Sequence, residues 1–294
     1  MKIYLSLLIS KKNLSTLKKC LISLNNLKIH NRINFKFVFI IDHKIKIVSN
    51  LIGKIIDKKK CVFIFSKKTN IPYSRNKFLN YLKLNKFDYA GFIDDDCLID
   101  KNWLINMYKF IKQEKCHVIG GPQYHEIKNK KFKIYYDNLE PKKKNKETTR
   151  WIATNNCFFS NYIFKVRDLA FEEKLRNYGG SDQLFFLQLT MNGVIIKWNS
   201  SAFVTEQYQS IREKIDWFFM RNLRYGYSGN QIDKIIYKKK FLLIIFIKII
   251  YLILNIGFNL LLFKRKNLIL SQFYFFRVIG RIKDLLNYKP EKYV

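Results

Sequence analysis

The sequence has few acidic residues and lacks the cysteine and histidine patterns of several protein classes. Its 294 residues include 55 Lys and Arg against 22 Asp and Glu, which gives a formal net charge of +33. The five cysteines are widely spaced without a CxxC pair, and the four histidines form no recognisable pattern. These absences argue against a disulfide framework, a zinc finger and a Ser-His-Asp or Cys-His nucleophile. The odd number of thiols is typical of reduced cysteines in a cytosolic compartment.

The large positive charge has three possible meanings, namely nucleic-acid binding, attraction to an anionic membrane surface, and a biased composition. The lysines are spread along the whole chain, with short runs at 58–60, 142–144 and 238–240. No Arg-rich recognition helix accompanies them, as a nucleic-acid-binding protein would require. We therefore favour compositional bias with membrane attraction, and we expect no nucleic-acid partner.

Apolar and polar stretches alternate in a way that predicts an α/β fold. The chain is 48% hydrophobic and 16% aromatic, which argues against a disordered protein. Residues 1–10 superficially look like a signal peptide, but they lack a small-residue cleavage site and are followed by Lys11 and Lys12, so we expect a buried strand. The pattern predicts strands at 3–9, 35–41, 61–65, 89–93 and 118–119, and helices at 14–24, 51–56, 74–84 and 102–113. This order predicts a mostly parallel central sheet with helices on both faces.

Three consecutive carboxylates, Asp94–Asp96, directly follow the apolar strand predicted at 89–93. Like charges this close raise one another's pKa unless a cation neutralises them, and carboxylate oxygens suit a divalent metal, which could in turn hold a diphosphate. The alternative is a solvated acidic turn, since Asp is common in turns. Asp42 also follows a predicted strand. Because ligands bind at the carboxyl ends of parallel strands, we expect both to face one crevice.

The middle of the chain contains further candidates. Residues 128–146 are polar and Lys-rich and are predicted to form an exposed loop. The segment 178–182 predicts a turn followed by a helix that starts near Asp182, where the helix dipole favours an ionised carboxylate. Its alternative role is that of an ordinary first-turn residue. Trp151, Trp198 and Tyr208 could stack on a sugar ring, although for Trp198, which follows the apolar run 194–196, we favour packing in the core.

Six segments in order carry a resemblance to a known family: Asp42, 71–76, 94–96, 154–156, 179–182 and 221–226. The chain resembles family 2 glycosyltransferases, inverting enzymes of the GT-A fold, over about residues 1–230. It is most similar to the bacterial exopolysaccharide transferases of the succinoglycan type, whose members also end in a membrane-associated region, and residues 277–281 resemble that branch too. The resemblance implies a Rossmann-like GT-A catalytic domain at 1–232 and a membrane-associated helical region at 233–294. Within the catalytic domain it implies a nucleotide-sugar-binding half at about 1–120 and an acceptor and catalytic half at 121–232.

The resemblance also implies a metal and its ligands. Asp94 and Asp96 match the outer carboxylates of the DxD motif, which holds Mn²⁺ or Mg²⁺ against the diphosphate of a nucleotide sugar. Asp95, between them, is assigned to the donor site. Glu206 stands where many relatives carry a His near the metal, so it is a candidate oxygen ligand. The lone His125 is expected to be a hydrogen-bonded structural residue.

The remaining roles concern the nucleotide and the acceptor. Asp42 matches the strand-end acid that contacts the nucleobase or ribose, and Arg75 is expected to line the nucleotide pocket. Asp182 matches the catalytic base, although the preceding residue is Ser where the family usually has Glu. Arg221 and Arg224 could contact the diphosphate from a mobile loop. Alternatively, Arg221 and Arg224 are surface charges on an amphipathic helix. The nearby Arg212 has the same two possible roles.

The C-terminal region contains an apolar run at 241–263 between two basic triplets. The run is long enough to cross a bilayer, but Lys248 in its middle would cost about 2.5–3.5 kcal/mol there. Both flanks are basic, and basic flanks prefer the cytoplasmic side. We therefore expect a helix lying in the membrane interface, or a re-entrant hairpin turning near 255–257. The alternative is a buried core helix.

These expectations define one leading function and two rivals. The leading function is metal-dependent, inverting transfer of a sugar, with a UDP-sugar as the favoured donor, onto a glycan or glycolipid acceptor. It would take place in surface polysaccharide synthesis at the cytoplasmic face of the inner or plasma membrane, with the protein peripheral or monotopic. The rivals are a metal-dependent nucleotidyl or phosphoryl transferase, and a non-catalytic basic scaffold docked on a membrane.

Overall fold

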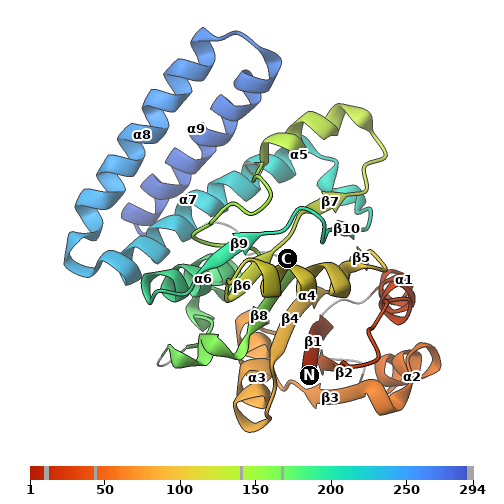
Figure 1. Cartoon of the computed structure of the whole chain (residues 1–294). Helices are drawn as coiled ribbons and strands as arrows, with labels where there is room; N and C mark the ends of the chain where they lie inside the picture. The colour runs from red at the N-terminus through yellow and green to blue at the C-terminus, as the bar shows by residue number, and fades with distance from the viewer. Residues whose placement is uncertain (10–12, 43–44, 140–141, 167–168, 290–294) are drawn as a thin grey trace. The chain divides into compact units, whose positions relative to one another are not determined.

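The computed structural model describes residues 1–9, 13–42, 45–139, 142–166 and 169–289 (Figure 1). The chain divides into two compact units. The first comprises residues 1–126, 143–173 and 182–207, and the second comprises residues 127–142, 174–181 and 208–294. The boundary predicted between residues 232 and 233 lies within a continuous helix, Ile215–Tyr237, and it stays a prediction.

The first unit is built on a seven-stranded sheet in the order β3-β2-β1-β4-β8-β6-β9. The strands are β1 (Lys2–Ile9), β2 (Asn34–Ile41), β3 (Cys61–Phe65), β4 (Tyr89–Asp94), β6 (Val118–Gly120), β8 (Asn156–Ser160) and β9 (Ile196–Trp198). Among these described strands only β8 is antiparallel to its neighbours, β4 and β6. The predicted mostly parallel α/β sheet is therefore confirmed.

Helices cover both faces of this sheet, as predicted. The helices α1 (Leu14–Asn25), α2 (Ile45–Ile55) and α4 (Trp103–Gln113) share a hydrophobic core with one face, and α3 (Ile71–Leu84) and α6 (Ser181–Met191) share a core with the other. Side chains of β1 alternate between the two cores, with Leu5 in the first and Tyr4 in the second. The helix α3 begins before the predicted residue 74 because Asn70 caps it, accepting a hydrogen bond from the Tyr73 N–H.

A three-stranded sheet adjoins the acidic segment. It consists of β5 (Cys97–Ile99), β10 (Val204–Glu206) and β7 (Gln123–His125), with β10 in the middle. The register places Glu206 opposite both Cys97 and His125. Residues far apart in the sequence thereby meet beside the carboxyl end of β4.

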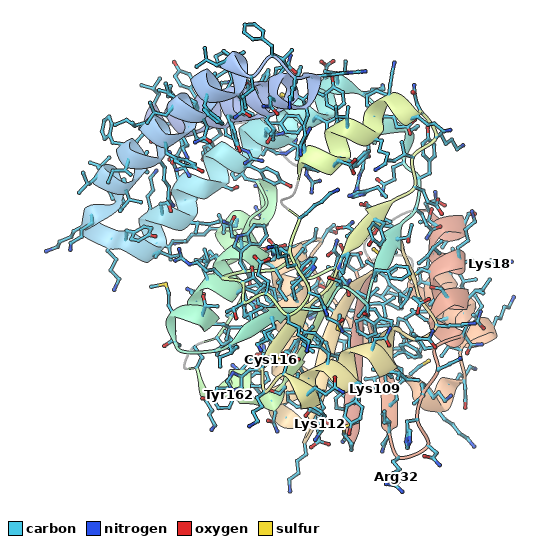
Figure 2. All side chains as sticks on the ribbon, turned by 45° about the horizontal axis from the view of Figure 1, so that its top comes forward. Lys18, Arg32, Lys109, Lys112, Cys116 and Tyr162 are labelled. Carbon is cyan, nitrogen blue, oxygen red and sulfur yellow. The ribbon has the colours of Figure 1, made fainter. Side chains whose placement is uncertain are left out.

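Basic side chains of the first unit lie at separate places on its outside. Lys18 on α1, Arg32 before β2, and the pair Lys109 and Lys112 on α4 point outward at different positions (Figure 2). This arrangement agrees with a charge that is spread along the chain.

The second unit is helical. It contains α5 (Lys133–Leu139), α7 (Ile215–Tyr237), α8 (Phe241–Leu261) and α9 (Arg265–Leu285). The prediction of an exposed loop over 128–146 is wrong, because a 3₁₀ turn and α5 occupy residues 130–139. Phe132 and Leu139 are buried in a small core with Phe218 and Phe273. These apolar residues are interspersed with lysines, which made the segment look solvent-exposed.

The apolar run forms one uninterrupted helix, α8, with α9 beside it (Figure 1). The chain reverses between Leu261 and Arg265, so the re-entrant turn predicted near 255–257 is wrong. Gly257 sits within the helix, where a single glycine is tolerated. Within the helical stretch Ile215–Leu261, the apolar part that includes α8 is long and apolar enough to cross a membrane. This long apolar helix is consistent with membrane association.

The helices α7 and α9 pack unusually closely. A Cβ atom on Gly226 would lie 2.0 Å from the carbonyl oxygen of Arg277, and one on Gly280 would lie 2.0 Å from that of Leu223. Each helix therefore needs a glycine where the other backbone approaches. The contact joins two segments, 221–226 and 277–281, that carry the sequence resemblance, so part of that resemblance reflects helix packing.

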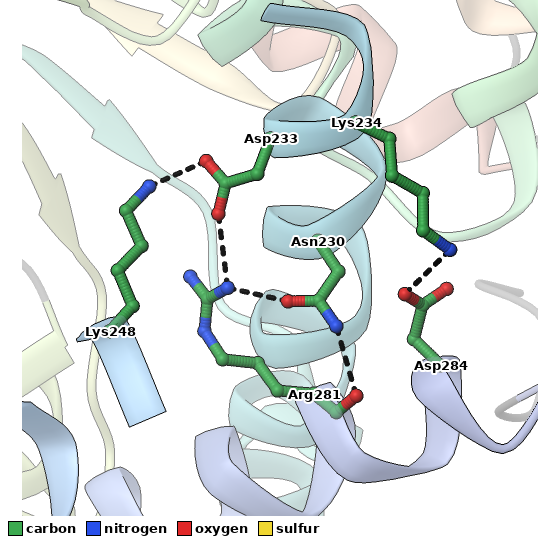
Figure 3. A network of polar contacts seen from close by, with 6 residues as sticks. All are labelled: Asn230, Asp233, Lys234, Lys248, Arg281 and Asp284. Carbon is green, nitrogen blue, oxygen red and sulfur yellow. Dashed lines mark hydrogen bonds and ion pairs between the residues drawn. The ribbon is translucent and has the colours of Figure 1, made fainter. Parts of the chain in front are cut away.

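A network of charged side chains, in which both carboxylates are buried, connects the three long helices (Figure 3). Asp233 on α7 pairs with Lys248 on α8 and with Arg281 on α9, whose Nη1 lies 3.0 Å from Asp233 Oδ2. Asp284 on α9 lies 2.9 Å from Lys234 Nζ and accepts a hydrogen bond from Gln231. The ammonium of Lys248 thus has a carboxylate partner, which offsets the cost expected for a charge within an apolar helix.

Candidate functional site

The acidic cluster lies at the carboxyl end of β4, at the edge of the first unit's sheet. Asp94 is the last residue of β4 and its side chain is 41% exposed, whereas Asp95 and Asp96 are buried in the turn that leads to β5. The Asp96 carbonyl accepts a hydrogen bond of 2.9 Å from the Gln207 N–H. Because two of the three side chains are buried, the cluster is not a solvated turn.

The charges of this cluster affect the pKa values of two buried thiols. Burial raises the pKa of Cys20 on α1 well above its usual value, and the charges of Asp95, Asp96 and Asp94 raise it further. Burial also raises the pKa of Cys157 on β8 to about 12, with Asp94 and Asp182 adding to the increase and Arg75 opposing it. Arg75, Asp94 and Asp182 therefore all lie near enough to Cys157 for their charges to act on its thiol.

Arg75 projects from the first half of α3 towards the cluster. Its Nη2 lies 3.8 Å from Asp94 Oδ1, and its side chain is 11% exposed. Asp42 follows β2, and β2 and β4 flank β1 in parallel, with Ile41 opposite Ile9 and Asp94 opposite Leu8. The two strands thus end level at the same edge of the sheet, as the sequence predicted. The assigned roles of these residues in nucleotide binding stay predictions.

Asp182 lies in the first turn of α6. It follows Gly179 and Gly180, which have φ angles of +82° and +86°, a conformation that favours glycine. Asp182 Oδ1 accepts a hydrogen bond of 2.8 Å from the Gln183 N–H, and the side chain is half-buried. The predicted turn and helix start are confirmed, while the role of Asp182 as a base stays a prediction.

Glu206 belongs to a hydrogen-bonded group that spans β7 and β10. Its Oε2 accepts a hydrogen bond of 2.7 Å from Gln123 Nε2 and lies 2.9 Å from His125 Nδ1. Gln123 in turn accepts a hydrogen bond from the Asn155 amide. His125 is hydrogen-bonded, as the sequence predicted, but its partner could not be predicted because the register of two short strands brings the pair together.

Asn156 occupies the centre of this region in a structural role that the sequence did not reveal. Its Oδ1 accepts a hydrogen bond of 2.7 Å from Trp103 Nε1, and its Nδ2 donates to the carbonyl oxygens of Pro122 and Ala202. The side chain is buried. Asn156 therefore joins β8 to α4 and to the loops before β7 and β10.

The aromatic rings considered for sugar stacking contact lysines. Lys143 Nζ lies 5.4 Å from the Trp151 ring centroid and 4.6 Å from that of Trp198, and Lys128 Nζ lies 4.3 Å from that of Tyr208. Such contacts are cation–π interactions. They give these rings a packing role within the protein.

The arginines of the second unit also contact aromatic rings. Arg221 on α7 lies 5.0 Å from the Trp217 ring, and its Nε donates a hydrogen bond of 2.6 Å to the Tyr225 hydroxyl. Arg212 lies 5.5 Å from the same Trp217 ring. Arg224 lies one turn further along α7 and is half-buried. The assignment of Arg221 and Arg224 to the donor diphosphate stays a prediction.

The arrangement of a parallel sheet with an acidic cluster at its edge agrees with a sequence comparison. Residues 7–173, more than half of the chain, match the family described as Glycosyl transferase family 2. The protein belongs to glycosyl transferase family 2. The predicted family is thereby confirmed. No curated protein sequence matches the chain.

Solved structures share the fold at low sequence identity. The structure of S. aureus TarS 1–349 in complex with UDP-GlcNAc matches with a TM-score of 0.55 and 17% identity, covering 77% of this chain and 66% of that chain. The structure of S. aureus TarS matches with a TM-score of 0.53 and 17% identity, covering 82% and 44%. This chain therefore spans less than two thirds of the length of those proteins. At this identity the likeness concerns the fold.

Members of this family commonly use a divalent metal, and the acidic cluster fits one. Among the described residues, no three His, Cys, Asp or Glu side chains converge as a preformed metal site. Asp94, Asp96 and Glu206 therefore do not form a ready-made three-residue cage. Mg²⁺ is typically bound by one or two carboxylates, with waters and substrate phosphates as the other ligands. Asp94 and Asp96 can supply such carboxylates, and burial together with the charges of all three aspartates raises the pKa of the neighbouring Cys20.

Proposed function

We propose that this protein is a glycosyltransferase that moves a sugar from a nucleotide-sugar donor, a UDP-sugar, onto a glycan or lipid-linked saccharide. The observation that carries the proposal is the acidic cluster at the carboxyl end of β4, with Arg75 3.8 Å from Asp94, in a member of family 2. The structural neighbour in complex with UDP-GlcNAc supports a uridine nucleotide as the donor.

The donor's diphosphate would be bound by the acidic cluster through a metal. Asp94 and Asp96 would hold Mn²⁺ or Mg²⁺, which supplies Lewis-acid neutralisation of the leaving diphosphate. Arg75, 3.8 Å from Asp94, is close enough to this cluster to add hydrogen bonds to phosphate oxygens. Asp95 lies in the same turn. Glu206, on β10, would be a further oxygen ligand of the metal.

The other groups act on the nucleoside and the acceptor. Asp42, at the end of β2, would contact the ribose or base. Asp182 would accept the proton of the acceptor hydroxyl as that oxygen attacks the anomeric carbon, while the bond from that carbon to the diphosphate breaks. Attack from the side opposite the leaving group inverts the anomeric configuration. Arg221 and Arg224 would contribute further cationic contacts to the diphosphate.

The C-terminal helices would hold the enzyme on an anionic membrane at the cytoplasmic face. Phe246, Ile250 and Leu254 on α8 are each more than half exposed. Basic triplets at 238–240 and 264–266 flank the helix, and lysines near a bilayer are attracted to its anionic lipids. Lys248 ties α8 to the polar helix α7. A helix tied to a polar neighbour in this way favours lying in the interface over crossing the bilayer.

Incubation of the protein with UDP-sugars, Mn²⁺ and lipid-linked saccharide acceptors, followed by mass spectrometry of the products, tests this function. The proposal predicts an acceptor heavier by one sugar residue, together with free UDP. A nucleotidyl or phosphoryl transferase would instead convert the nucleotide without adding sugar to the acceptor. A non-catalytic scaffold would leave all substrates unchanged, and either result would contradict the proposal.

A further inference from the structure

One phenylalanine connects the elements that carry the proposed donor and base residues. Phe171 lies between β8 and α6 and is 2% exposed. Its ring stacks on Phe185 of α6, with centroids 4.1 Å apart and planes 7° apart, and it meets Phe92 of β4 edge-on at 5.7 Å. The guanidinium of Arg75 lies 5.6 Å from the same ring.

These contacts lie close to the candidate site along the chain. Phe185 comes three residues after Asp182, so the two share a face of α6. Phe92 comes two residues before Asp94, and Arg75 itself lies 3.8 Å from Asp94. The position of Phe171 therefore helps to set the position of Asp182 relative to Arg75 and Asp94.

Asn76 on α3 fixes the backbone of Phe171 from both sides. Its Nδ2 donates a hydrogen bond of 2.9 Å to the Phe171 carbonyl oxygen, and its Oδ1 accepts one of 2.7 Å from the Phe171 N–H. A side-chain amide provides one donor and one acceptor in this geometry, which neither a carboxylate nor an apolar side chain can reproduce.

These two hydrogen bonds between Asn76 and the backbone of Phe171, here called the clamp, matter because the chain around Phe171 has little regular structure. Between β8 and α6 the described residues form short 3₁₀ turns at Asn161–Lys165 and Glu173–Asn177. Neither turn includes Phe171, so ladder or helix hydrogen bonds do not hold this residue. Its backbone is instead held by a side chain 95 residues away in the sequence.

We propose that Asn76 is a positioning residue of the transfer reaction. By clamping Phe171 it holds Asp182, through Phe185, at the distance from the donor groups that proton removal from the acceptor requires. This inference rests on the proposed glycosyltransferase function. Asn76 itself contacts neither donor nor acceptor in this account.

A loosened clamp should impair sugar transfer to the acceptor more than donor binding or hydrolysis of the donor. Displacing a reacting group by about 1 Å can cost on the order of 100-fold in rate. Donor binding at Asp94 and Arg75 does not need Asp182, so the donor Kd should change little. Hydrolysis, in which a water oxygen bonds to the anomeric carbon as UDP leaves and the water's proton passes to bulk solvent, needs no positioned acceptor. Loss of the clamp should therefore lower the ratio of transfer to hydrolysis.

The test compares Asn76→Asp with Asn80→Asp, which makes the same change on the same helix at an exposed position. Asn76→Asp keeps the size and the acceptor but replaces the donor with a carboxylate that faces the Phe171 carbonyl. We expect a fall in transfer kcat of about 10- to 100-fold. The UDP Kd should stay within about twofold of wild type, and the transfer-to-hydrolysis ratio should fall in parallel with kcat. Asn80→Asp should match wild type in all three.

A second variant keeps the test informative if Asn76→Asp does not fold. Phe185→Leu removes the stacked ring but leaves the clamp. It should lower transfer kcat and the transfer-to-hydrolysis ratio without changing the UDP Kd, and the fall in kcat should be smaller than for Asn76→Asp. Variants with wild-type kcat and product ratio, or with donor affinity falling as much as kcat, would overturn the positioning role. A wild-type protein that turns over no nucleotide sugar would contradict the proposed function itself. The two failures are therefore distinguishable.

Discussion

The two units of this protein arrange their carboxylates differently. In the second unit, Asp233 faces Lys248 and Arg281, and Asp284 faces Lys234, so each buried negative charge has a cation from a neighbouring helix. In the first unit, three consecutive carboxylates lie side by side near one arginine, Arg75, and their charges raise the pKa of the buried Cys20 thiol. The first arrangement stabilises a fold, whereas the second concentrates negative charge where a cation can bind.

The largest effect is expected from the carboxylate assigned to proton removal. Asp182→Asn keeps the side-chain shape and its place in α6 but removes the base, so transfer should fall by about 10²- to 10⁴-fold. UDP binding, measured by calorimetry, should be unchanged. The exposed Asp137→Asn serves as a control with wild-type activity. Full turnover by Asp182→Asn would show that another group is the base.

Breaking the charge network of the second unit should lower stability and leave nucleotide binding in the first unit unaffected. Asp233→Ala leaves Lys248 and Arg281 without their carboxylate, which should reduce the free energy of unfolding by about 3–5 kcal/mol. Asp216→Ala, at an exposed carboxylate of the same helix, should cost less than about 1 kcal/mol. Denaturant titration of the detergent-solubilised protein measures both. Equal effects would contradict a structural role for the network.

The basic residues that flank α8 should contribute to membrane binding and not to the stability of the fold. Replacing Lys238–Lys240 with glutamines should weaken binding to vesicles that contain phosphatidylserine by about 3 kcal/mol, at about 1 kcal/mol for each lysine. The same replacement at Lys58–Lys60, an exposed triplet of the first unit, is a matched control in charge. Vesicle co-sedimentation reports the difference. Similar losses of vesicle binding in both variants would mean that binding depends only on the net charge of the protein, and this would contradict a specific role for the flank of α8.

Glycine substitutions in the helices of the second unit are predicted to have the smallest effects, which are changes in stability. Gly226→Ala puts a Cβ against the Arg277 carbonyl and should destabilise the protein by about 1–3 kcal/mol. Gly257→Ala in α8 meets no atom within 4 Å and should stabilise its helix by about 0.5–1 kcal/mol. Opposite signs in thermal unfolding are the expected result, and a destabilising Gly257→Ala would contradict this view of α8.

Much of the first unit could be predicted because its strands are buried on both faces. Such strands are continuous apolar runs, and the run at Lys2–Ile9 is visible without any tertiary information. The start of α6 near Asp182 was signalled by two glycines. Local composition was misleading in α5, where lysines conceal a buried apolar face, and in α8, where polar residues near 255–257 do not interrupt the helix.

The features that escaped prediction depend on contacts between distant residues. The pairing of His125 with Glu206 requires the register of two three-residue strands. The partner of Lys248 lies on another helix, and the clamp of Asn76 on Phe171 spans 95 residues. No periodicity in the sequence encodes such pairs, although it does predict the elements that carry them.

The most direct test of the account is the thermal stability of wild type and Asp96→Ala with UDP, with Mn²⁺, and with both. A ligand that binds the folded state raises its stability, by about 2.7 kcal/mol at 100 times its Kd. The account predicts an increase in Tm for wild type that requires UDP and Mn²⁺ together, and no such increase for Asp96→Ala. An equal increase in both proteins would contradict the central claim that the acidic cluster of the first unit binds the metal and the nucleotide.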